Sequence, residues 1–428
     1  MNEYDCAIIG GGIAGLTLAY NLSKQGKKII LIEKDKNLGG MLKSVKRDNY
    51  YIEEFYHHIL PFNDNVSALI NELGLKKDFI WKDASTSFYY DGKFYNMTIP
   101  FHLLTFKPLN FFDKIRLGLF LLRIKLIKNP AIFDNIPAEE FIKKNAGDSV
   151  YLRFFKPLLS AKYGKNLNKI SSGWFIDRIN IRNKRGYKGE TLGYLEGGFE
   201  KLIEKLVNEL KKNKCKILTG KKVEKMVLKH DKAAFLIVNG KKIYAKDFVS
   251  TISGKDLIKL CSFPQDYIKK LNSLNSQSAI CILIGLKKKL TNFYWTNLIK
   301  EDISFRAIIE HTNFMPIEKY GEHLVYLASY PDSDSDVWNL SDKQIFERYF
   351  KDLEKIVNIN LNAINWYKVI KEKEAGLIYE TGILKKIMPV ETPISNIYIA
   401  GMLNSYPDRN LEQSIILANK VVNLILKK

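Results

Sequence analysis

The first 33 residues contain a strand, a glycine-rich turn, a helix and a second strand that ends in an acidic residue. The apolar run 4–9 leads into Gly10-Gly11-Gly12-Ile13-Ala14-Gly15, and Glu33 follows 18 residues beyond Gly15. In such a unit the first glycine makes a tight turn, the second lets the backbone approach a pyrophosphate, and the third lets the helix pack on the strand. The free N–H groups of Ile13 and Ala14 would attract phosphate, and Glu33 can accept hydrogen bonds from ribose hydroxyls. The pattern predicts a nucleotide-binding unit.

A second glycine pair follows the acid. Gly39-Gly40 begins six residues past Glu33 and is followed by Met41. This arrangement resembles the glutathione-reductase-like FAD-binding proteins, and within them the amine oxidase, protoporphyrinogen oxidase and phytoene desaturase superfamily. The resemblance implies FAD as the cofactor, with Lys34 and the glycine pair beside it. Members of that group carry arginine where this chain has Met41, so one expected charge contact is missing.

Two later segments share the resemblance. Residues 222–252 are typical of a strand, a hairpin through Asn-Gly and a further strand, and Val223 matches the family valine that lies against the adenine. Near the C-terminus a strand ends at glycine, and a helix is predicted from residue 411 to about residue 426. In the family this glycine and helix face the pyrophosphate and ribityl chain, which implies contacts from Gly401, Met402, Asn410 and Leu411. Many members carry aspartate at the position of Met402.

The order of these motifs implies an α/β protein with a discontinuous glutathione-reductase-like, FAD-binding Rossmann domain. The domain would consist of residues 1–75, 186–265 and 385–428. Residues 76–185 and 266–384 would form a discontinuous α+β substrate domain, with a helical insertion and an antiparallel sheet over the flavin. Strand-like runs at 278–286, 306–311 and 323–330 are expected to supply that sheet.

The adjacent pair His57-His58 is the first candidate for chemistry. An imidazole can act as a general acid or base, or polarise a flavin carbonyl. Neighbouring residues of an extended chain point in opposite directions, so only one of the two need face a flavin. The segment resembles a stretch of the UDP-galactopyranose mutases whose histidine lies against the flavin, and His58 is the matching position. A purely structural role for both histidines stays open. No metal is expected, because no further ligand stands at metal-binding spacing.

Arginines are the second set of candidates. The chain has only 10 Arg among its 67 basic residues, and Arg suits bidentate binding of phosphate. Arg178 and Arg182 are spaced four residues apart, and Arg409 lies in a segment that resembles the end of the mutases. Mutases hold a sugar-nucleotide diphosphate with Arg. An anionic small-molecule substrate therefore stays open, beside simple neutralisation of Arg178 by acids such as Asp177.

The segment 111–128 is apolar nearly all round. At about 100° per residue, Lys114, Lys125 and Lys128 share one line along a helix, and Arg116 and Arg123 share a nearly opposite one. An interfacial helix would gather its bases on one side, so the pattern favours a partly buried helix whose basic side chains reach solvent. The resemblance implies an alternative, because related flavoenzymes use this insertion to touch membranes and admit lipophilic substrates.

Composition excludes several classes of protein. The net charge of +21 comes mainly from Lys spread along the chain, so a nucleic-acid partner is not expected. Four scattered Cys form no disulfide framework, no apolar run reaches the roughly 18 residues of a membrane span, and the N-terminus lacks a signal-peptide pattern. These features predict a reduced, cytoplasmic protein, with contact at the inner face of the membrane left open. The oligomeric state is not predicted.

Together the motifs predict an enzyme, a FAD-dependent oxidoreductase that transfers a hydride from an organic substrate to the flavin, with His58 or His57 positioning or deprotonating the substrate. The alternative is a non-redox flavoenzyme similar to the UDP-galactopyranose mutases, which would depend on Arg178 and Arg409. A FAD-containing scaffold without catalysis is a third alternative, because Met41 and Met402 replace two typical contacts.

Overall fold

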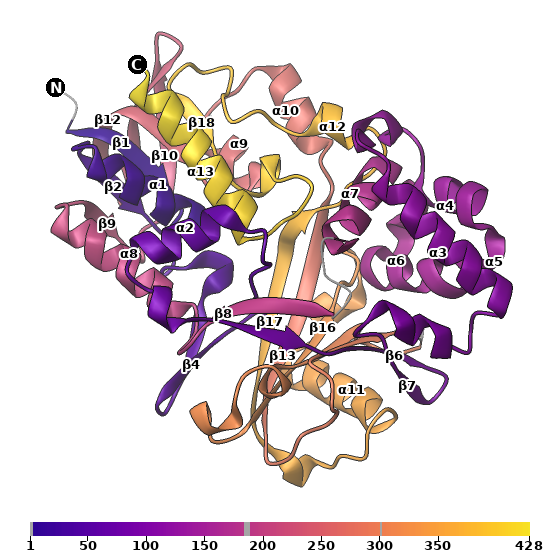
Figure 1. Cartoon of the computed structure of the whole chain (residues 1–428). Coiled ribbons are helices and arrows are strands. Elements are labelled where there is room, and N and C mark those ends of the chain that lie inside the picture. The colour runs from indigo at the N-terminus through magenta and orange to yellow at the C-terminus, as the bar shows by residue number, and fades with distance from the viewer. Residues whose placement is uncertain (1–2, 184–188, 300–301) are drawn as a thin grey trace. The chain divides into compact units, whose positions relative to one another are not determined.

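The computed structural model describes residues 3–183, 189–299 and 302–428, without the side chains of 182 and 183. The chain divides into two compact units (Figure 1). The first consists of Met1–Ile80, Tyr194–Asn275 and Lys386–Lys428, and the second of Trp81–Gly193 and Ser276–Lys385. Both units combine helices with sheets, so the predicted α/β class is confirmed at that level.

A parallel sheet forms the centre of the first unit. β1 (Tyr4–Ile9) pairs in parallel with β2 (Ile29–Ile32) on one side and with β12 (Lys241–Ser250) on the other. β9 (Lys216–Leu218) continues the sheet beyond β2, and β18 (Ile397–Ile399) pairs with the end of β12. β2 and the second half of β1 are buried throughout, and they appear in the sequence as continuous apolar runs. The start of β12 pairs instead with an antiparallel hairpin, β10 (Val223–Lys229) and β11 (Lys232–Val238).

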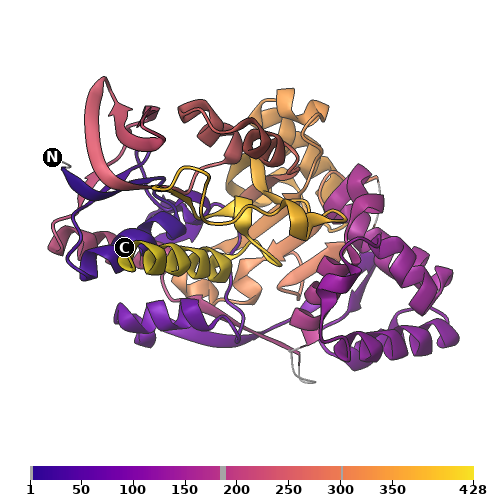
Figure 2. The ribbon, with the colours of Figure 1, turned by 90° about the horizontal axis from the view of Figure 1, so that it is seen from above.

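Helices from opposite ends of the chain lie together on this unit. α1 (Ile13–Lys24) and α13 (Leu411–Leu426) are side by side, and the Asn21 amide donates a hydrogen bond of 2.7 Å to the Asn419 amide oxygen (Figure 2). The other elements of this unit are β3 (Ser44–Arg47), β4 (Tyr50–Glu53), α2 (Asp64–Glu72), α8 (Glu200–Lys212), α9 (Gly254–Leu260) and α10 (Gln265–Asn272).

The second unit contains a seven-stranded sheet in the order β17-β13-β16-β15-β14-β6-β7. The three runs expected to form antiparallel strands do so, as β13 (Ser276–Leu286), β15 (Ala307–Glu310) and β16 (His323–Ser329). β14 and β6 pair in parallel, and all other neighbours are antiparallel. The remaining strands are β6 (Thr86–Tyr90), β7 (Lys93–Asn96), β14 (Trp295–Leu298) and β17 (Ile364–Leu377).

Helices complete the second unit. α11 (Asp342–Glu354) packs Ile345, Tyr349 and Leu353 into the core of the sheet. The helical segment before β8 contains α3 (Phe111–Lys125), α4 (Ala138–Ala146), α5 (Asp148–Val150), α6 (Lys156–Tyr163) and α7 (Ser172–Asn183). A separate two-stranded sheet pairs β5 (Phe79–Ala84) with β8 (Glu190–Leu195), and α12 is Ile383–Lys386. Among the described residues, no helix combines the length and the hydropathy that a bilayer-spanning segment requires.

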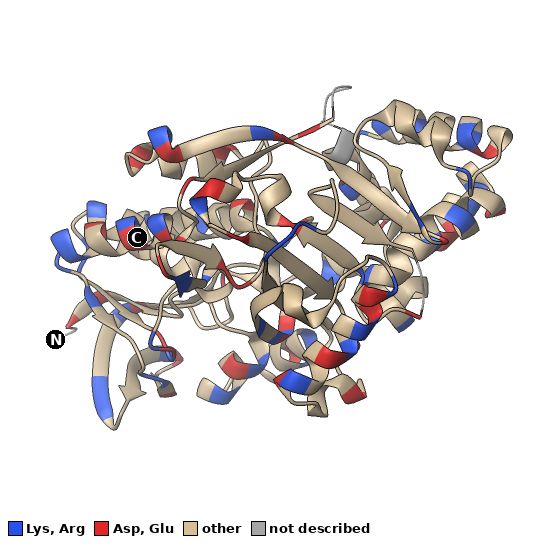
Figure 3. Ribbon diagram, turned by 90° about the horizontal axis from the view of Figure 1, so that it is seen from below, with Lys and Arg blue, Asp and Glu red and all other residues tan. Residues whose placement is uncertain are grey.

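Basic residues occur along both units, with acidic residues among them (Figure 3). Several lysines pair with nearby acids: Lys246 lies 2.7 Å from Asp5, and Lys143 lies 2.7 Å from Glu139 one helical turn away. Such exposed pairs contribute little to stability, at most about 1 kcal/mol each. The lysine excess therefore occupies mainly solvated positions.

Candidate flavin site

The glycine-rich turn joins the end of β1 directly to α1. Gly10 has a φ of +108°, which glycine adopts without strain. A methyl group on Gly15 would lie 2.1 Å from the carbonyl oxygen of Gly10, so only hydrogen fits there. The N-cap residue Gly12 has no side chain to bond the first turn of α1. The N–H groups of Ile13 and Ala14 therefore have no intrahelical acceptor and are available to a ligand.

The second glycine pair lies against this turn. The Gly39 N–H donates a hydrogen bond of 2.8 Å to the carbonyl of Gly11, and Gly39 forms a β-bridge with Gly12. A methyl group on Gly40 would lie 3.1 Å from the Cα atom of Gly12. The turn of residues 10–15 and the glycine pair 39–40 thus lie against each other and present backbone without bulky side chains.

A basic residue follows this glycine pair in the chain, although not at position 41. Met41 is half-buried, whereas Lys43 forms an ion pair with Asp35. Lys43 was not among the residues predicted from the sequence to lie at the site. The feature of the sequence that could have identified it is a basic residue two positions after Met41.

Glu33 lies at the end of β2, beside the glycine turn. Its Oε2 atom accepts a hydrogen bond of 2.6 Å from the Gly11 N–H, and Oε1 accepts one of 2.9 Å from the Asp35 N–H. The residue is only 8% exposed. A carboxylate has about four acceptor positions, so Glu33 retains capacity for ribose hydroxyls. Lys34, in contrast, is exposed to solvent.

The carboxyl ends of β12 and β18 meet the same turn. The Thr251 hydroxyl donates to the carbonyl of Ile9 at 3.0 Å, and a methyl group on Gly401 would lie 3.4 Å from the Thr251 carbonyl oxygen. Asn404 holds the Gly401 turn, because its side chain accepts from the Gly401 N–H and donates to the carbonyl of Ile399, both at 3.0 Å. Thr251 and Asn404 were not predicted from the sequence. The Thr251 side chain bonds the backbone of β1, and the Asn404 side chain bonds the backbone of the neighbouring β18.

The N-terminus of α13 follows this turn. The Asn410 side chain caps the helix by accepting from the Gln413 N–H at 3.0 Å. Leu411 is the first residue of the helix, so its N–H has no intrahelical acceptor. Met402 is half-buried in the preceding turn. Glu412, which sequence reasoning also missed, accepts hydrogen bonds from the backbone N–H groups of Asn65 and Val66 at 3.1 and 3.0 Å. It thereby fixes α2 to the first turn of α13.

Val223 begins β10 and is buried. Two residues earlier, the Lys221 N–H donates a hydrogen bond of 3.0 Å to the carbonyl of Glu33. The segment that leads into Val223 is therefore joined to the end of β2 by a backbone hydrogen bond.

The histidine pair lies between β4 and α2 in the first unit. His57 places Nδ1 at 2.7 Å from the Phe55 carbonyl oxygen. A carbonyl can only accept, so Nδ1 carries the proton and Nε2 keeps its lone pair. Burial lowers the pKa of His57 to about 4, so the ring is neutral at physiological pH. His58 is half-buried.

The two predicted catalytic arginines lie in different units. Arg409 is half-buried in the first unit, in the segment between Gly401 and α13. Arg178 is half-buried on α7 of the second unit. The predicted helical spacing of Arg178 and Arg182 is confirmed for the backbone, while the Arg182 side chain lies outside the described residues.

A buried carboxyl group lies at the end of β4. Glu53 accepts hydrogen bonds from the Tyr194 hydroxyl at 2.7 Å and from the Phe199 N–H at 2.5 Å. Burial outweighs these bonds and raises the pKa of Glu53 to about 7. The folded state therefore binds a proton more tightly than the unfolded state, whose glutamate titrates near its ordinary value. Stability contributed by this proton is present at acidic pH and is lost as the pH rises through about 7.

We expect Glu53→Gln to reduce the difference in the free energy of unfolding between pH 5 and pH 8. The reduction should be about 3 kcal/mol, since one pKa unit corresponds to about 1.4 kcal/mol. Urea denaturation at the two pH values measures it. Tyr194→Phe is the matched control, because it removes a hydrogen bond to the same carboxyl group but leaves the group able to titrate. An unchanged pH dependence in Glu53→Gln would contradict the assignment.

Comparison with known proteins gives the family. The family described as flavin containing amine oxidoreductase matches residues 13–426. A 4,4'-diapolycopen-4-al dehydrogenase from Metabacillus indicus is 25% identical, over 92% of this chain and 91% of its own length. A solved structure from Exiguobacterium sp. 255-15, assigned provisionally as a protoporphyrinogen oxidase, has a TM-score of 0.81 at 19% identity and covers 100% of both chains.

A structure of reduced UDP-galactopyranose mutase is also similar, with a TM-score of 0.77 at 16% identity over 99% of this chain and 96% of the mutase. At these identities the likeness to solved structures shows the fold alone, so the mutase activity has weaker support than oxidoreduction. The family match extends over nearly the whole chain and agrees with the predicted FAD cofactor and enzyme class. The chain therefore belongs to the flavin containing amine oxidoreductase family and is a flavin-dependent oxidoreductase.

Proposed function

We propose that residues 1–75, 186–265 and 385–428 form the glutathione-reductase-like FAD-binding domain, and that residues 76–185 and 266–384 bind the substrate. The first of these sets overlaps most of the first unit, whose bounds differ from it by up to ten residues. The observation that carries this proposal is the meeting of two glycine segments, Glu33 and Gly401 at the carboxyl ends of parallel strands. Ligands of open α/β sheets bind outside that edge.

The groups at this edge fit the parts of FAD. Close backbone approach and the free N–H groups of α1 suit a diphosphate, and the Glu33 carboxylate suits a ribose. The proposed contacts are Gly10, Gly12, Ile13, Ala14, Gly15, Glu33, Lys34, Gly39, Gly40, Met41, Val223, Gly401, Met402, Asn410 and Leu411. When bound, FAD supplies the acceptor for a hydride from the substrate.

The histidine pair is proposed to act on the substrate. His57 is held in one tautomer by the Phe55 carbonyl and stays neutral above about pH 5, so its Nε2 atom can accept a proton or a hydrogen bond. His58 is half-buried beside it in the sequence and is the other candidate for the same role. Arg178 and Arg409 are proposed to hold an anionic group, if the substrate carries one.

The proposed reaction is oxidation of a lipophilic organic molecule. The two similar oxidoreductases described above are named for 4,4'-diapolycopen-4-al and protoporphyrinogen. Both names therefore describe redox enzymes that act on organic substrates. The first experiment mixes oxidised enzyme anaerobically with such compounds and follows the flavin absorbance. Bleaching in proportion to product formation supports the proposal. Turnover of a sugar nucleotide that requires prior flavin reduction would favour the mutase alternative instead.

We expect His58→Asn or His57→Asn to slow flavin reduction by the substrate about 10²- to 10⁴-fold, the usual contribution of a general acid or base. Stopped-flow absorbance under anaerobic conditions measures this rate. His230→Asn is the matched control, because His230 is an exposed residue in a turn before β11. If both variants of the pair reduce flavin at the control's rate, the pair is structural.

A further inference from the structure

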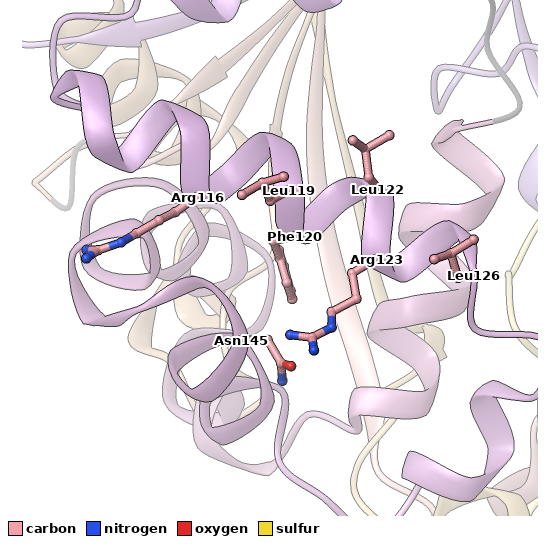
Figure 4. Close-up of a pocket in the computed structure, with 7 residues that line it drawn as sticks. All are labelled: Arg116, Leu119, Phe120, Leu122, Arg123, Leu126 and Asn145. Carbon is pink, nitrogen blue, oxygen red and sulfur yellow. The ribbon is translucent and has the colours of Figure 1, made fainter.

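α3 of the second unit is the partly buried helix that the sequence predicts. Leu117 is buried on one side of it, whereas Leu119 and Leu122 are exposed on the other. A groove of about 390 Å³ lies between α3 and Asn145 of α4. The Arg123 and Asn145 side chains turn toward one another, whereas Leu122 points away from Asn145 (Figure 4). Arg123 is exposed to solvent, in contrast to a cluster of polar groups that the first unit encloses.

This enclosed cluster lies at the end of β4. Glu53 is 1% exposed, and its two carboxyl oxygens have different partners: Oε1 accepts from the Phe199 N–H at 2.5 Å, and Oε2 accepts from the Tyr194 hydroxyl at 2.7 Å. Tyr194 and Phe199 are fully buried, and their rings are in edge-on contact with centroids 5.2 Å apart. One carboxyl group therefore fixes the backbone of Phe199 and the aromatic ring packed against it.

The backbone before Phe199 is shaped for this bond. Gly198 has a φ of +89°, a conformation that favours glycine. A methyl group on Gly198 would lie 3.1 Å from the Glu53 Oε1 atom and 3.2 Å from the Tyr51 carbonyl oxygen. Phe199 is also the N-cap residue of α8, so its position sets the start of that helix. A larger residue than glycine would strain the turn and crowd the carboxyl oxygen.

The Phe199 ring reaches the histidine pair. His57 and Phe199 are in edge-on contact, with ring centroids 6.4 Å apart and ring planes at 74°. The His57 Nδ1 atom lies 2.7 Å from the Phe55 carbonyl oxygen, and the segment that carries both residues follows Glu53, the last residue of β4. The imidazole is thus held by its own backbone and by a ring whose position depends on Glu53.

The carboxyl group is costly where it lies. Burial raises the pKa of Glu53 to about 7, and Glu200 of α8, the charged residue that acts on it, raises that pKa further because it is also acidic. A leucine would fill a similar space without burying an ionisable group. It would, however, leave the Phe199 N–H and the Tyr194 hydroxyl without this acceptor. What the carboxyl group supplies is therefore a fixed position for these two groups.

We propose that Glu53 is a positioning residue, which orients the His57 ring through Phe199 so that the His57 Nε2 atom stays available to the substrate. This inference rests on the proposed role of His57 in the reaction. Glu53 itself does not touch the substrate in this scheme. All three residues belong to the first unit, so the chain of contacts is complete within one compact body.

Nuclear magnetic resonance of the flavin-loaded full chain tests the contact without turnover. With ¹⁵N-labelled histidine, the His57 signals are assigned by their loss in His57→Asn, and we expect one neutral tautomer with the proton on Nδ1. Phe199→Leu removes the ring but keeps the N–H that Glu53 binds. We expect mixed tautomers in this variant and a His57 pKa that rises toward 6.5, because water gains access to the ring. Phe263→Leu is the matched control, because Phe263 is 6% exposed in the same unit and its ring packs on Tyr267 instead.

Two substitutions of Glu53 separate positioning from general stability. Glu53→Leu removes the acceptor, whereas the amide of Glu53→Gln can accept from the Phe199 N–H and donate to the Tyr194 hydroxyl oxygen. We therefore expect mixed His57 tautomers in Glu53→Leu and a single tautomer in Glu53→Gln. Glu310→Leu is the matched control, because Glu310 is also a buried, hydrogen-bonded carboxyl group but belongs to the second unit. It should lower the thermal midpoint and leave the His57 tautomer unchanged.

Flavin reduction, followed by anaerobic stopped-flow absorbance, measures the consequence for the reaction. The reductant is whichever compound bleaches the flavin of the unsubstituted enzyme in the experiment proposed above. We expect the rate to fall about 10- to 100-fold in Phe199→Leu and Glu53→Leu, the usual effect of displacing a reacting group by about 1 Å. Glu53→Gln should restore a rate close to that of the unsubstituted enzyme.

The two measurements distinguish the possible failures. A single, unchanged His57 tautomer in both Phe199→Leu and Glu53→Leu would overturn the positioning role, even if His57→Asn is slow. If Glu53→Leu does not fold, Phe199→Leu alone decides this point. Flavin reduction at the normal rate in His57→Asn would instead refute the proposed function of His57, and the positioning role with it. Equal rates in Glu53→Gln and Glu53→Leu, both far below normal, would also overturn the proposal, since the restored contacts would then have no effect.

Discussion

Gly15→Ala is expected to abolish flavin binding. The added methyl group would lie 2.1 Å from the carbonyl oxygen of Gly10, a backbone atom that cannot rotate away. The start of α1 would have to move from the end of β1, and the N–H groups that the helix presents would move with it. Overpacking of this kind costs about 3 kcal/mol. Because the displaced groups are those proposed to hold the diphosphate, we expect FAD affinity to fall at least about 100-fold.

The measurement is flavin absorbance of the purified variant, followed by titration of the apoprotein with FAD. Gly118→Ala is the matched control, because no atom lies within 4 Å of the position a methyl group would take and Gly118 is within α3. Alanine there should stabilise the helix by about 0.5–1 kcal/mol and leave the flavin content unchanged. Stoichiometric FAD in Gly15→Ala would show that the glycine turn is not the cofactor site.

Glu33→Ala should produce the second largest loss of FAD affinity. The Gly11 and Asp35 N–H groups would lose their acceptor, at a cost of about 1–3 kcal/mol for each group that stays buried. The proposed acceptor for the ribose hydroxyls would be lost as well. We therefore expect the thermal midpoint to fall and FAD affinity to decrease about 100-fold or more.

Two controls separate the effects of this substitution. Glu224→Ala removes the same charge from an exposed position on β10 and should change neither quantity. The thermal midpoint of the apoprotein reports the loss of the Gly11 and Asp35 hydrogen bonds, whereas the midpoint shift on adding FAD reports binding. If FAD raises the midpoint of Glu33→Ala as much as it raises that of the unsubstituted protein, Glu33 has only a structural role.

The local sequence pattern was sufficient to predict the strands and helices whose formation depends on neighbouring residues. The strand, turn and helix of residues 4–24 appear as predicted, because glycine spacing and apolar runs act within one turn or strand. The same holds for β13, β15 and β16, whose strand-like runs were recognisable one by one. The N-terminus of α13 also coincides with the predicted start at Leu411, since Asn410 is a strong N-cap residue.

Several features of the flavin site could not be read from local pattern. Asn404 and Thr251 are ordinary polar residues in the sequence, and only the folded chain shows that they bond the backbone of β18 and β1. Glu412 likewise gains its role from the start of α2, nearly 350 residues away. The missing arginine at position 41 was visible in the sequence, but the ion pair of Lys43 with Asp35 depends on how the turn folds.

By itself, the sequence determined the nucleotide-binding unit and individual strands such as β1, β13, β15 and β16, because glycine geometry and apolar periodicity are local properties. The flavin family was indicated by the resemblance of its motifs to those of known proteins. Only the tertiary structure decided which surface of α3 faces solvent. A helix that is apolar all round can bury either side, and the choice depends on the helices that pack against it. Here Leu117, Phe120 and Ile124 are buried and the leucines opposite them are exposed between two rows of bases. The free energy of packing against the neighbouring helices, which no single segment encodes, decided which side of α3 is exposed.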